Sequence, residues 1–497
     1  MKIRMTKTCT VSMLVLLAAS CAQDGFDDKE KFSAGVTNAQ LESPEISSDC
    51  FSTLTNPDGS ESVKFSWPLV MGAGGYLCNV KVVDDPANPE YLVTDSVVDG
   101  TTLTFVRRED TSYEVSVKTL GNDKYNNTEA QSASVFAYST MLPAVKIPAG
   151  VELSQWVAQN LVPGEDEIGF ELEAGATYKL EGTLDFGLNK VTFRGNKARR
   201  PVIEVGENGC LTTQAGLKVK FINFDCTNSK QKGLLTLSDQ PNDILLNKNY
   251  PTVYVNAGNS CYIIEDPVMF QCVNVKNMPK GLLYGNKTAW ALTDFRVDDC
   301  IFQLNNASSD GFINLHESGA GLIKNMVLSN STFYNLAENE SGYFIRYANA
   351  SNAQPKKIYG DALNASNHRI TNCTFVRTFT AKDFGNQILN NAVFTQTVDH
   401  CIFYDVFRIY QYLQNNNKKT TEFNTMHYEI TEPQSNDTGG RKDTQGNPLT
   451  TLDDPKFAGQ FLQELDLTKE NGGINLRPTS SYTVDNKIGD LRWFEMQ

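Results

Sequence analysis

This 497-residue chain has few histidines, no long apolar run and no excess of positive charge. The apolar run near its start, Val11 to Ala18, is shorter than the about 20 residues that a membrane-spanning helix needs. The four histidines are scattered and the cysteines show neither CxxC nor Cys/His spacing, which argues against a zinc site. The net charge of −14 argues against nucleic acid and anionic lipid headgroups as partners, although a local basic patch would still accept an anionic ligand.

The content of apolar residues predicts a folded, globular protein. Hydrophobic residues make up 40% and aromatic residues 10% of the chain, which is typical of globular proteins. A chain of this length is expected to form two or three domains.

The N-terminus predicts export. Lys2, Arg4 and Lys7 precede the apolar run, and Ala18-Ala19-Ser20-Cys21 follows it as a lipobox-like sequence, so residues 1–20 are expected to be a lipoprotein signal peptide with Cys21 lipidated. Residues 21–40 are rich in acidic side chains and are expected to be a solvated tether.

This N-terminus resembles that of Bacteroidetes-type surface lipoproteins, in which an acidic segment follows the lipidated cysteine. The resemblance implies an outer-membrane protein that faces the cell exterior. Ala18 stands where Leu is commoner in that family, and a lipoprotein that faces the periplasm is the alternative.

The cysteines are expected to be packing residues. Eleven are present, but Cys9 leaves with the signal peptide and Cys21 carries lipid, so an odd number remains. Most of the later ones fall in apolar runs such as 299–302 and 372–375. We therefore expect them to be small buried apolar side chains.

Residues 41–141 show short alternating runs that predict a β-sandwich. The runs are 63–67, 76–82, 102–106 and 113–117. Trp67, Tyr76 and the Tyr113-x-Val115-x-Val117 stretch resemble a fibronectin type III module. That resemblance implies that Trp67 is a core residue, that Tyr113 locks a corner and that the module is a spacer. Residues 142–148, with Pro143 and Pro148, are expected to be a short linker, and 151–161 a helical cap.

From 168 to about 407 one pattern recurs at variable spacing, which predicts a solenoid within residues 149–497. An apolar strand ends at Asn, Asp or His; a small residue, one spacer and Phe follow. The pattern occurs at Phe302, Phe333, Phe375 and Phe403. Each repeat is expected to be one coil of a parallel β-helix.

The recurring residues have expected places in such a coil. Asn330 and Asn372 suit a left-handed bend at a stacked corner. The small residues after the bend are expected to stack inside the helix, and the four phenylalanines to form a parallel ladder. The small residues are Cys300, Ser331, Cys373 and Cys401. The later segment from Asn415 to Gly459 is expected to be an irregular loop region.

The coil pattern resembles the right-handed β-helix of pectate lyases and their non-catalytic relatives. With the lipobox, the sandwich and the ending at 488–493, the chain also resembles uncharacterised lipoproteins of Sus-type polysaccharide-utilisation systems, whose usual ending has Pro in place of Leu491. The resemblance implies an all-β fold and the capture or processing of glycan at the cell surface, with a Sus-type transporter as the candidate partner.

Catalytic chemistry has weak support in the sequence. Residues 398–401 resemble part of the Trp-Ile-Asp-His motif of pectate lyases, but Thr397 replaces the Trp, so a corner role for Asp399 and His400 is favoured. If the chain is a lyase, Asp399 and His400 are its candidates and calcium its candidate cofactor; otherwise no cofactor or metal is expected. Asp298 and Asp299 should point to opposite faces. A hydrolase would need convergent carboxylates, for which Asp310, Glu317 and Asp399 are candidates.

Three groups of residues are candidates for carbohydrate binding, with packing as the alternative role for each. The residues are Arg408, Tyr410 and Tyr412; Arg346 and Tyr347; and Trp290. The favoured function is a surface lipoprotein that binds polysaccharide, which predicts exposed aromatics along one solenoid face. A β-helix lyase or glycosidase and a structural or adhesive spacer are the alternatives.

Overall fold

The computed structural model describes residues 35–246, 261–278, 280–307, 311–316, 321–337, 342–347, 366–378, 384–386, 394–406, 409, 419–428, 450–451, 454–460 and 462–495. The chain forms two compact units, residues 1–141 and 142–497. The expected signal peptide and Cys21 lie outside the described residues. No helix in the described ranges is long and apolar enough to cross a membrane.

The first unit is a β-sandwich, as its alternating runs predicted. Its strands are β1 (Phe51–Thr55), β2 (Glu61–Ser66) and β5 (Thr102–Val106) in one sheet, and β4 (Glu90–Val98), β3 (Tyr76–Val82), β6 (Ser112–Thr119) and β7 (Ser134–Ser139) in the other. Trp67 is buried beside Phe65 and Tyr76, which confirms its core role. The Tyr113 hydroxyl accepts a hydrogen bond from Arg108 N at 2.7 Å and so locks the corner before β6.

The sandwich begins earlier than expected. Asn38 N donates to Tyr125 O and Leu41 N to Thr128 O, both at 3.0 Å. Asn38 and Gln40, expected in the tether, therefore lie against the sandwich, because their backbone groups continue a ladder with the segment before β7.

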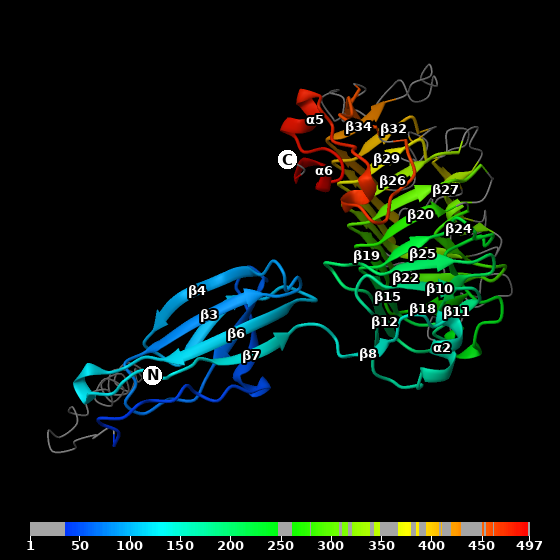
Figure 1. The fold of residues 1–497 in the computed structure, drawn as a ribbon. Coiled ribbons are helices and arrows are strands. Elements are labelled where there is room, and N and C mark those ends of the chain that lie inside the picture. The colour runs from blue at the N-terminus through cyan, green and yellow to red at the C-terminus, as the bar shows by residue number, and fades with distance from the viewer. Residues whose placement is uncertain are drawn as a thin grey trace, which may run out of the picture. The chain divides into compact units, whose positions relative to one another are not determined.

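The second unit is a parallel β-helix, which confirms the predicted fold class (Figure 1). Each coil visits three sheets in turn, and all strand pairs between coils are parallel. Sheet 1 contains β8 (Ala144–Ile147), β9 (Ile168–Leu172), β12 (Val191–Arg194), β15 (Leu217–Lys220), β19 (Val268–Gln271), β22 (Trp290–Asp298), β25 (Leu322–Ser329), β28 (Ser366–Thr371), β31 (Phe394–Asp399) and β33 (Lys419–Phe423), with β18 (Tyr262–Ile264) beside β22.

Sheets 2 and 3 complete the coils. Sheet 2 contains β10 (Thr177–Leu180), β13 (Val202–Val205), β16 (Asn223–Asp225), β20 (Asn274–Met278), β23 (Ile301–Leu304), β26 (Thr332–Asn335), β29 (Thr374–Val376), β32 (Ile402–Tyr404), β34 (Thr425–Tyr428) and β35 (Thr450–Thr451). Sheet 3 contains β11 (Thr183–Asp185), β14 (Cys210–Thr212), β17 (Leu235–Thr236), β21 (Leu283–Tyr284), β24 (Gly311–Leu315), β27 (Tyr343–Tyr347) and β30 (Gly385–Asn386). The expectation of a loop over 415–459 is wrong where β33, β34 and β35 continue the solenoid, because their pairing with the preceding coil orders them.

The corner between sheets 1 and 2 is built as predicted. Asn330 and Asn372 have φ of 44° and 51°, and Asp299, His400 and Asn424 share this left-handed conformation at the same corner. Asn and Asp tolerate this region better than other residues with a Cβ. The corner therefore turns with a single residue in each of these coils.

The residues after the corner fill the helix interior. Cys300, Ser331, Cys373 and Cys401 are fully buried. Adjacent rings of Phe302, Phe333, Phe375 and Phe403 are stacked, with centroids 4.8–5.5 Å apart and interplanar angles of 4–7°. The predicted ladder is thus confirmed. A second stack of Phe312, Phe344 and Phe384, which the coil pattern did not indicate, packs against the first ladder edge to face.

The cysteines behave as packing residues. Seven of the nine described cysteines are buried, and all nine are free. Burial raises the pKa of the Cys78, Cys261 and Cys272 thiols to about 12. These thiols therefore stay protonated near neutral pH.

Helix α2 (Leu153–Asn160) caps the first coils, as the 151–161 pattern predicted. Leu153 and Val157 are buried, and Trp156 packs edge to face on Phe170 with centroids 6.0 Å apart. Glu152 caps the helix by accepting Gln155 N at 2.9 Å.

Residues 454–495, here called the C-terminal segment, cover the outer side of sheet 2 from β16 to β34. The segment includes α5 (Ser481–Asp485) and α6 (Arg492–Glu495), which lie beside the strands of sheet 2 (Figure 1). One apolar cluster joins the two: Ile301, Tyr334 and Val376 from sheet 2, with Leu465, Ile474, Leu476 and Trp493 from the segment. This part of sheet 2 therefore offers little of its outer side to a ligand.

Polar contacts fasten the end of this segment. The fully buried Asp490 accepts Thr332 Oγ1 at 2.8 Å and Arg492 Nε at 2.9 Å. Arg492 also donates to Asp299 Oδ1 at 2.7 Å. Gly489 has φ of +108°, and a Cβ there would lie 2.8 Å from the Thr374 hydroxyl, so this position requires glycine.

Candidate functional site

The outer side of sheet 1 carries a continuous polar surface. In β22, Phe295 and Val297 are fully buried in the core, so the alternating residues Asp294, Arg296 and Asp298 point outward. The same alternation holds in β25, β28 and β31. Lys218 in β15 and Met269 in β19 point outward in the same way. We call the following residues the sheet 1 face: Lys218, Met269, Asp294, Arg296, Asp298, Asn325, Val327, Ser329, Asn367, Arg369, Thr371, Thr395, Thr397 and Asp399.

Strand register arranges this face in three columns along the solenoid. Arg296 pairs with Val327, Val327 with Arg369, and Arg369 with Thr397. Adjacent positions in a column are about 4.7–4.9 Å apart, the usual spacing of paired strands. The face is therefore a regular grid of side chains.

Local hydrogen bonds hold many of these side chains. Arg296 grips Asp294 with two bonds of 2.8 and 2.5 Å. Asp298 accepts Ser329 Oγ at 2.7 Å, and Asn367 donates to Asn325 at 3.3 Å. Such contacts orient donors and acceptors before any ligand arrives, which reduces the entropy lost on binding.

The arginines of the face reach solvent. The Arg296 side chain is 50% exposed and Arg369 is also exposed. Arg369 Nε donates to Thr371 Oγ1 at 3.1 Å, and within the described part of the chain Arg369 forms no ion pair. Most guanidinium N–H groups of Arg369 are thus available to a ligand.

Asp399 and His400, the lyase candidates, lie at the margin of this face. His400 Nδ1 is 2.6 Å from Asp399 Oδ1, and Asn424 Nδ2 is 3.2 Å from His400 Nε2. Because an amide NH₂ can only donate, Nε2 accepts and Nδ1 carries the proton. Both ring nitrogens therefore have partners, and the left-handed backbone of His400 accepts Gly489 N at 2.8 Å. These contacts favour the corner role over catalysis.

The structure corrects two candidates for carbohydrate binding. Trp290 is fully buried, and its Nε1 donates to Ser238 O at 2.9 Å. Tyr347 is also fully buried. Neither ring offers a face to a glycan, because both side chains fill the solenoid core.

The other candidates have different outcomes. Arg346 is half-buried on β27 and lies over the Tyr343 ring at 5.5 Å. The residues Arg408, Tyr410, Tyr412, Asp310 and Glu317 lie outside the described residues. Asp298 and Asp299 diverge, since Asp298 bonds within sheet 1 and Asp299 binds Arg492 at the corner.

Exposed aromatics along one solenoid face are not found in the described coils. Among the large apolar side chains of the described residues that are exposed, the aromatics are Tyr91 in the sandwich and Tyr482 in α5. The sheet 1 face therefore offers charged and polar groups for hydrogen bonding rather than aromatic rings. The relevant side chains, above all Lys218, Arg296 and Arg369, were missed because only the coil register shows that they share a column.

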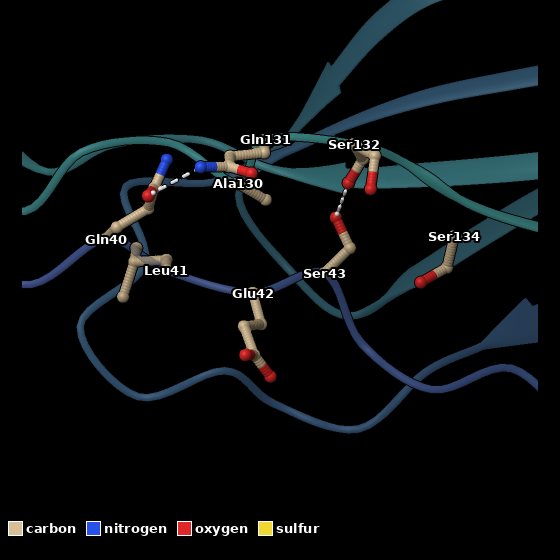
Figure 2. A pocket seen from close by; sticks show the side chains of 8 residues that line it. All are labelled: Gln40, Leu41, Glu42, Ser43, Ala130, Gln131, Ser132 and Ser134. Atoms are coloured by element: carbon tan, nitrogen blue, oxygen red, sulfur yellow. Dashed lines mark hydrogen bonds between the residues drawn. The ribbon is translucent and has the colours of Figure 1, made fainter.

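The sandwich holds a separate polar hollow of about 480 Å³ (Figure 2). Its lining residues are Gln40, Leu41, Glu42, Ser43, Ala130, Gln131, Ser132 and Ser134. Figure 2 shows two bonds that join its sides, Gln131 Nε2 to Gln40 Oε1 at 3.0 Å and Ser43 Oγ to Ser132 O at 2.6 Å. The sheet 1 face, in contrast, carries exposed guanidinium groups with N–H groups left for a ligand, and it is the stronger candidate.

No cluster of three or more His, Cys, Asp or Glu side chains that could hold a metal ion occurs among the described residues. The charged side chains of the sheet 1 face instead pair with each other or with amides and hydroxyls. The chemistry that they support is recognition of hydroxyl and carboxylate groups.

Comparisons with known proteins name no activity for the chain. One family model, described as a domain of unknown function (DUF4992), matches residues 2–181. A second, also described as a domain of unknown function (DUF4957), matches residues 176–336. The two matches meet in the first coil of the β-helix, at β10. No curated protein matches the chain.

Among solved structures, the chain is similar to a pectate lyase from Pectobacterium carotovorum. The identity is 13%, the match covers 65% of this chain and 84% of the lyase, and the TM-score is 0.13. A likeness at this level carries no argument about activity. The sheets of the structure themselves establish the β-helix.

Proposed function

We propose that this protein binds a linear polysaccharide along the sheet 1 face. The observation that carries the proposal is the grid of outward donors and acceptors over four successive coils, with Arg296 and Arg369 exposed in one column. Sugar hydroxyls and carboxylates need such paired groups. An elongated flat site suits a polymer better than a small molecule.

Retardation in affinity gels that contain polysaccharides tests the proposal. Arg369→Ala is expected to weaken binding about tenfold or more, because it removes charge-assisted hydrogen bonds. Arg108→Ala is the matched control, since Arg108 is an exposed arginine that grips Glu90 with two bonds but lies in the sandwich. Equal binding by wild type and Arg369→Ala would refute the assignment of the face.

The same assay separates capture from the alternatives. A lyase would generate unsaturated products, followed by their absorbance with calcium present, and would direct attention to Asp399, His400 and Arg369. A spacer would show no retardation with any glycan. The partnered imidazole of His400 favours capture over lysis.

Location at the cell surface is part of the proposal and depends on the N-terminal sequence. We propose cleavage before Cys21, lipidation of Cys21 and display of the protein on the outer membrane within a Sus-type system. Palmitate labelling of the wild type and of Cys21→Ser tests the anchor. Protease accessibility on intact cells tests which way the protein faces.

A further inference from the structure

The central column of sheet 1 carries a cation on every second coil from β15 to β28. Its successive register partners are Thr192, Lys218, Met269, Arg296, Val327, Arg369, Thr397 and Thr421. Cations therefore occur on alternate coils, with Met269 and Val327 between them. Two strand spacings place neighbouring cations about 9.6 Å apart at the backbone.

Each of the three cations keeps N–H groups for a ligand. Lys218 donates to Glu167 at 2.9 Å with one of its three N–H groups. Arg296 uses one edge of its guanidinium on Asp294, and Arg369 uses Nε on Thr371. Their exposure allows the remaining groups to point to solvent: the side chains of Lys218 and Arg296 are 33% and 50% exposed.

The residues between the cations have the opposite chemistry. Met269 and Val327 are half-buried and apolar. An apolar side chain on a flat face can contact the C–H side of a sugar ring, whereas a cation needs an oxygen acceptor. A ligand that satisfies this column presents acceptors at every second unit.

We propose that the sheet 1 face binds an extended linear glycan whose repeating unit is a disaccharide, in register with Lys218, Arg296 and Arg369. This inference rests on the proposed function and adds the repeat of the ligand. The paired strands fix the spacing between the cations, so the column selects glycans by the length of their repeat. A glycan with a different repeat that binds the first cation places its acceptors away from the next one.

The charge balance of the column predicts how binding responds to salt. Glu167 and Asp294 each lie in an ion pair with a cation of the column, at 2.9 and 2.5 Å. The column therefore acts by directed hydrogen bonds more than by a net positive field. Salt is expected to weaken binding only slightly, unlike the binding of polyanions to basic grooves.

The first test compares soluble polysaccharides of matched length in affinity gels with the full mature chain. Hyaluronan and unsulfated chondroitin have two-sugar repeats; amylose and polygalacturonate have one-sugar repeats, without and with carboxylates. The proposal expects the first pair to bind at least about tenfold better, the effect of one charged hydrogen bond lost from register. Equal or better binding of amylose or polygalacturonate would overturn it.

The second test moves one cation by a single coil without changing composition. The double variant Val327→Arg/Arg369→Val keeps the charge and the two side chains on the same face but breaks the two-coil period. It is expected to bind two-sugar glycans about tenfold more weakly, with circular dichroism unchanged. Unchanged affinity would disprove the role of the two-coil spacing.

The two proposals fail in different ways. If the wild type binds no glycan of the panel, the proposed function itself fails. If the wild type binds and Arg369→Ala weakens binding, but the double variant binds normally, then only the two-sugar register is wrong. Circular dichroism detects a folding failure of the double variant. In that case Met269→Lys provides the test, because a cation between Lys218 and Arg296 is expected to abolish the preference for two-sugar glycans.

Discussion

Removal of Arg492 should release the C-terminal segment from sheet 2. Asp490 is fully buried, and its ion-pair partner among the described residues is Arg492, at 2.9 Å. In Arg492→Met the carboxylate stays buried without a counter-charge. Methionine keeps much of the volume of the side chain, so the perturbation is mainly electrostatic.

The expected loss is about 3–5 kcal/mol at pH 7, the usual effect of removing one partner of a buried ion pair. The contact with Asp299 adds little, because that carboxylate is 43% exposed and such pairs contribute about 0–1 kcal/mol. The Asp490→Asn/Arg492→Met double variant removes both charges and is expected to lose much less. A buried pair often contributes no more than neutral groups of similar shape.

The loss should depend on pH. Burial raises the pKa of Asp490 above its usual value, while Arg492 opposes this rise. Without Arg492 the folded-state pKa rises further, so the folded variant holds the proton more tightly than the unfolded chain does. The stability that protonation supplies is complete below the unfolded pKa of about 3.9 and is lost as pH rises through the folded pKa. The difference in stability between Arg492→Met and the wild type should therefore become smaller as pH falls from 7 toward 4.

Proteolysis of the C-terminal segment in increasing urea is a suitable assay, because local opening exposes the segment before the solenoid unfolds. The fluorescence of Trp493, which is fully buried and bonded to Thr332, reports the same opening. The reasoning would be refuted if Arg492→Met matched the wild type at pH 7. It would also be refuted if the double variant were less stable than the single one.

Three further predictions concern the coils and the corner. Phe375→Ala, in the middle of the aromatic ladder, should destabilise the β-helix by about 3–5 kcal/mol in chemical denaturation, while Phe375→Leu should cost clearly less; similar losses would contradict the ladder's role. Asn372→Ala should cost about 1–2 kcal/mol and Asn372→Gly less, because φ is 51° there; the reverse order would exclude corner strain as the cause. His400→Asn keeps a residue suited to the corner, so glycan retardation should persist, and a loss of product formation would instead identify a lyase.

Much of the fold followed from local pattern. Alternation in 76–82 and 113–117 predicted strands of the sandwich, and the resemblance to a fibronectin type III module implied the core role of Trp67 and the corner role of Tyr113. The period-two pattern works here because one face of each strand is buried. The prediction of a loop at 415–459 was wrong at β33 and β35, because these strands pair with a preceding coil although their own sequences show little alternation.

The candidate site was less accessible to sequence reasoning. The local sequence could not reveal that Trp290 and Tyr347 face the core. Burial of a side chain depends on which side of the sheet is closed by other coils. That information is not local.

The sequence by itself determined the coil: a strand, a left-handed Asn, a small inward residue and a phenylalanine, all close along the chain. Only the tertiary structure decided which residues of different coils become neighbours. Lys218, Arg296 and Arg369 are separated by connections of unequal length, and the stacked corners bring them into one column. Arg492 likewise reaches Asp299 only because the C-terminal segment folds back over sheet 2. Backbone pairing between coils is the physical reason, since it sets register independently of the length of the loops.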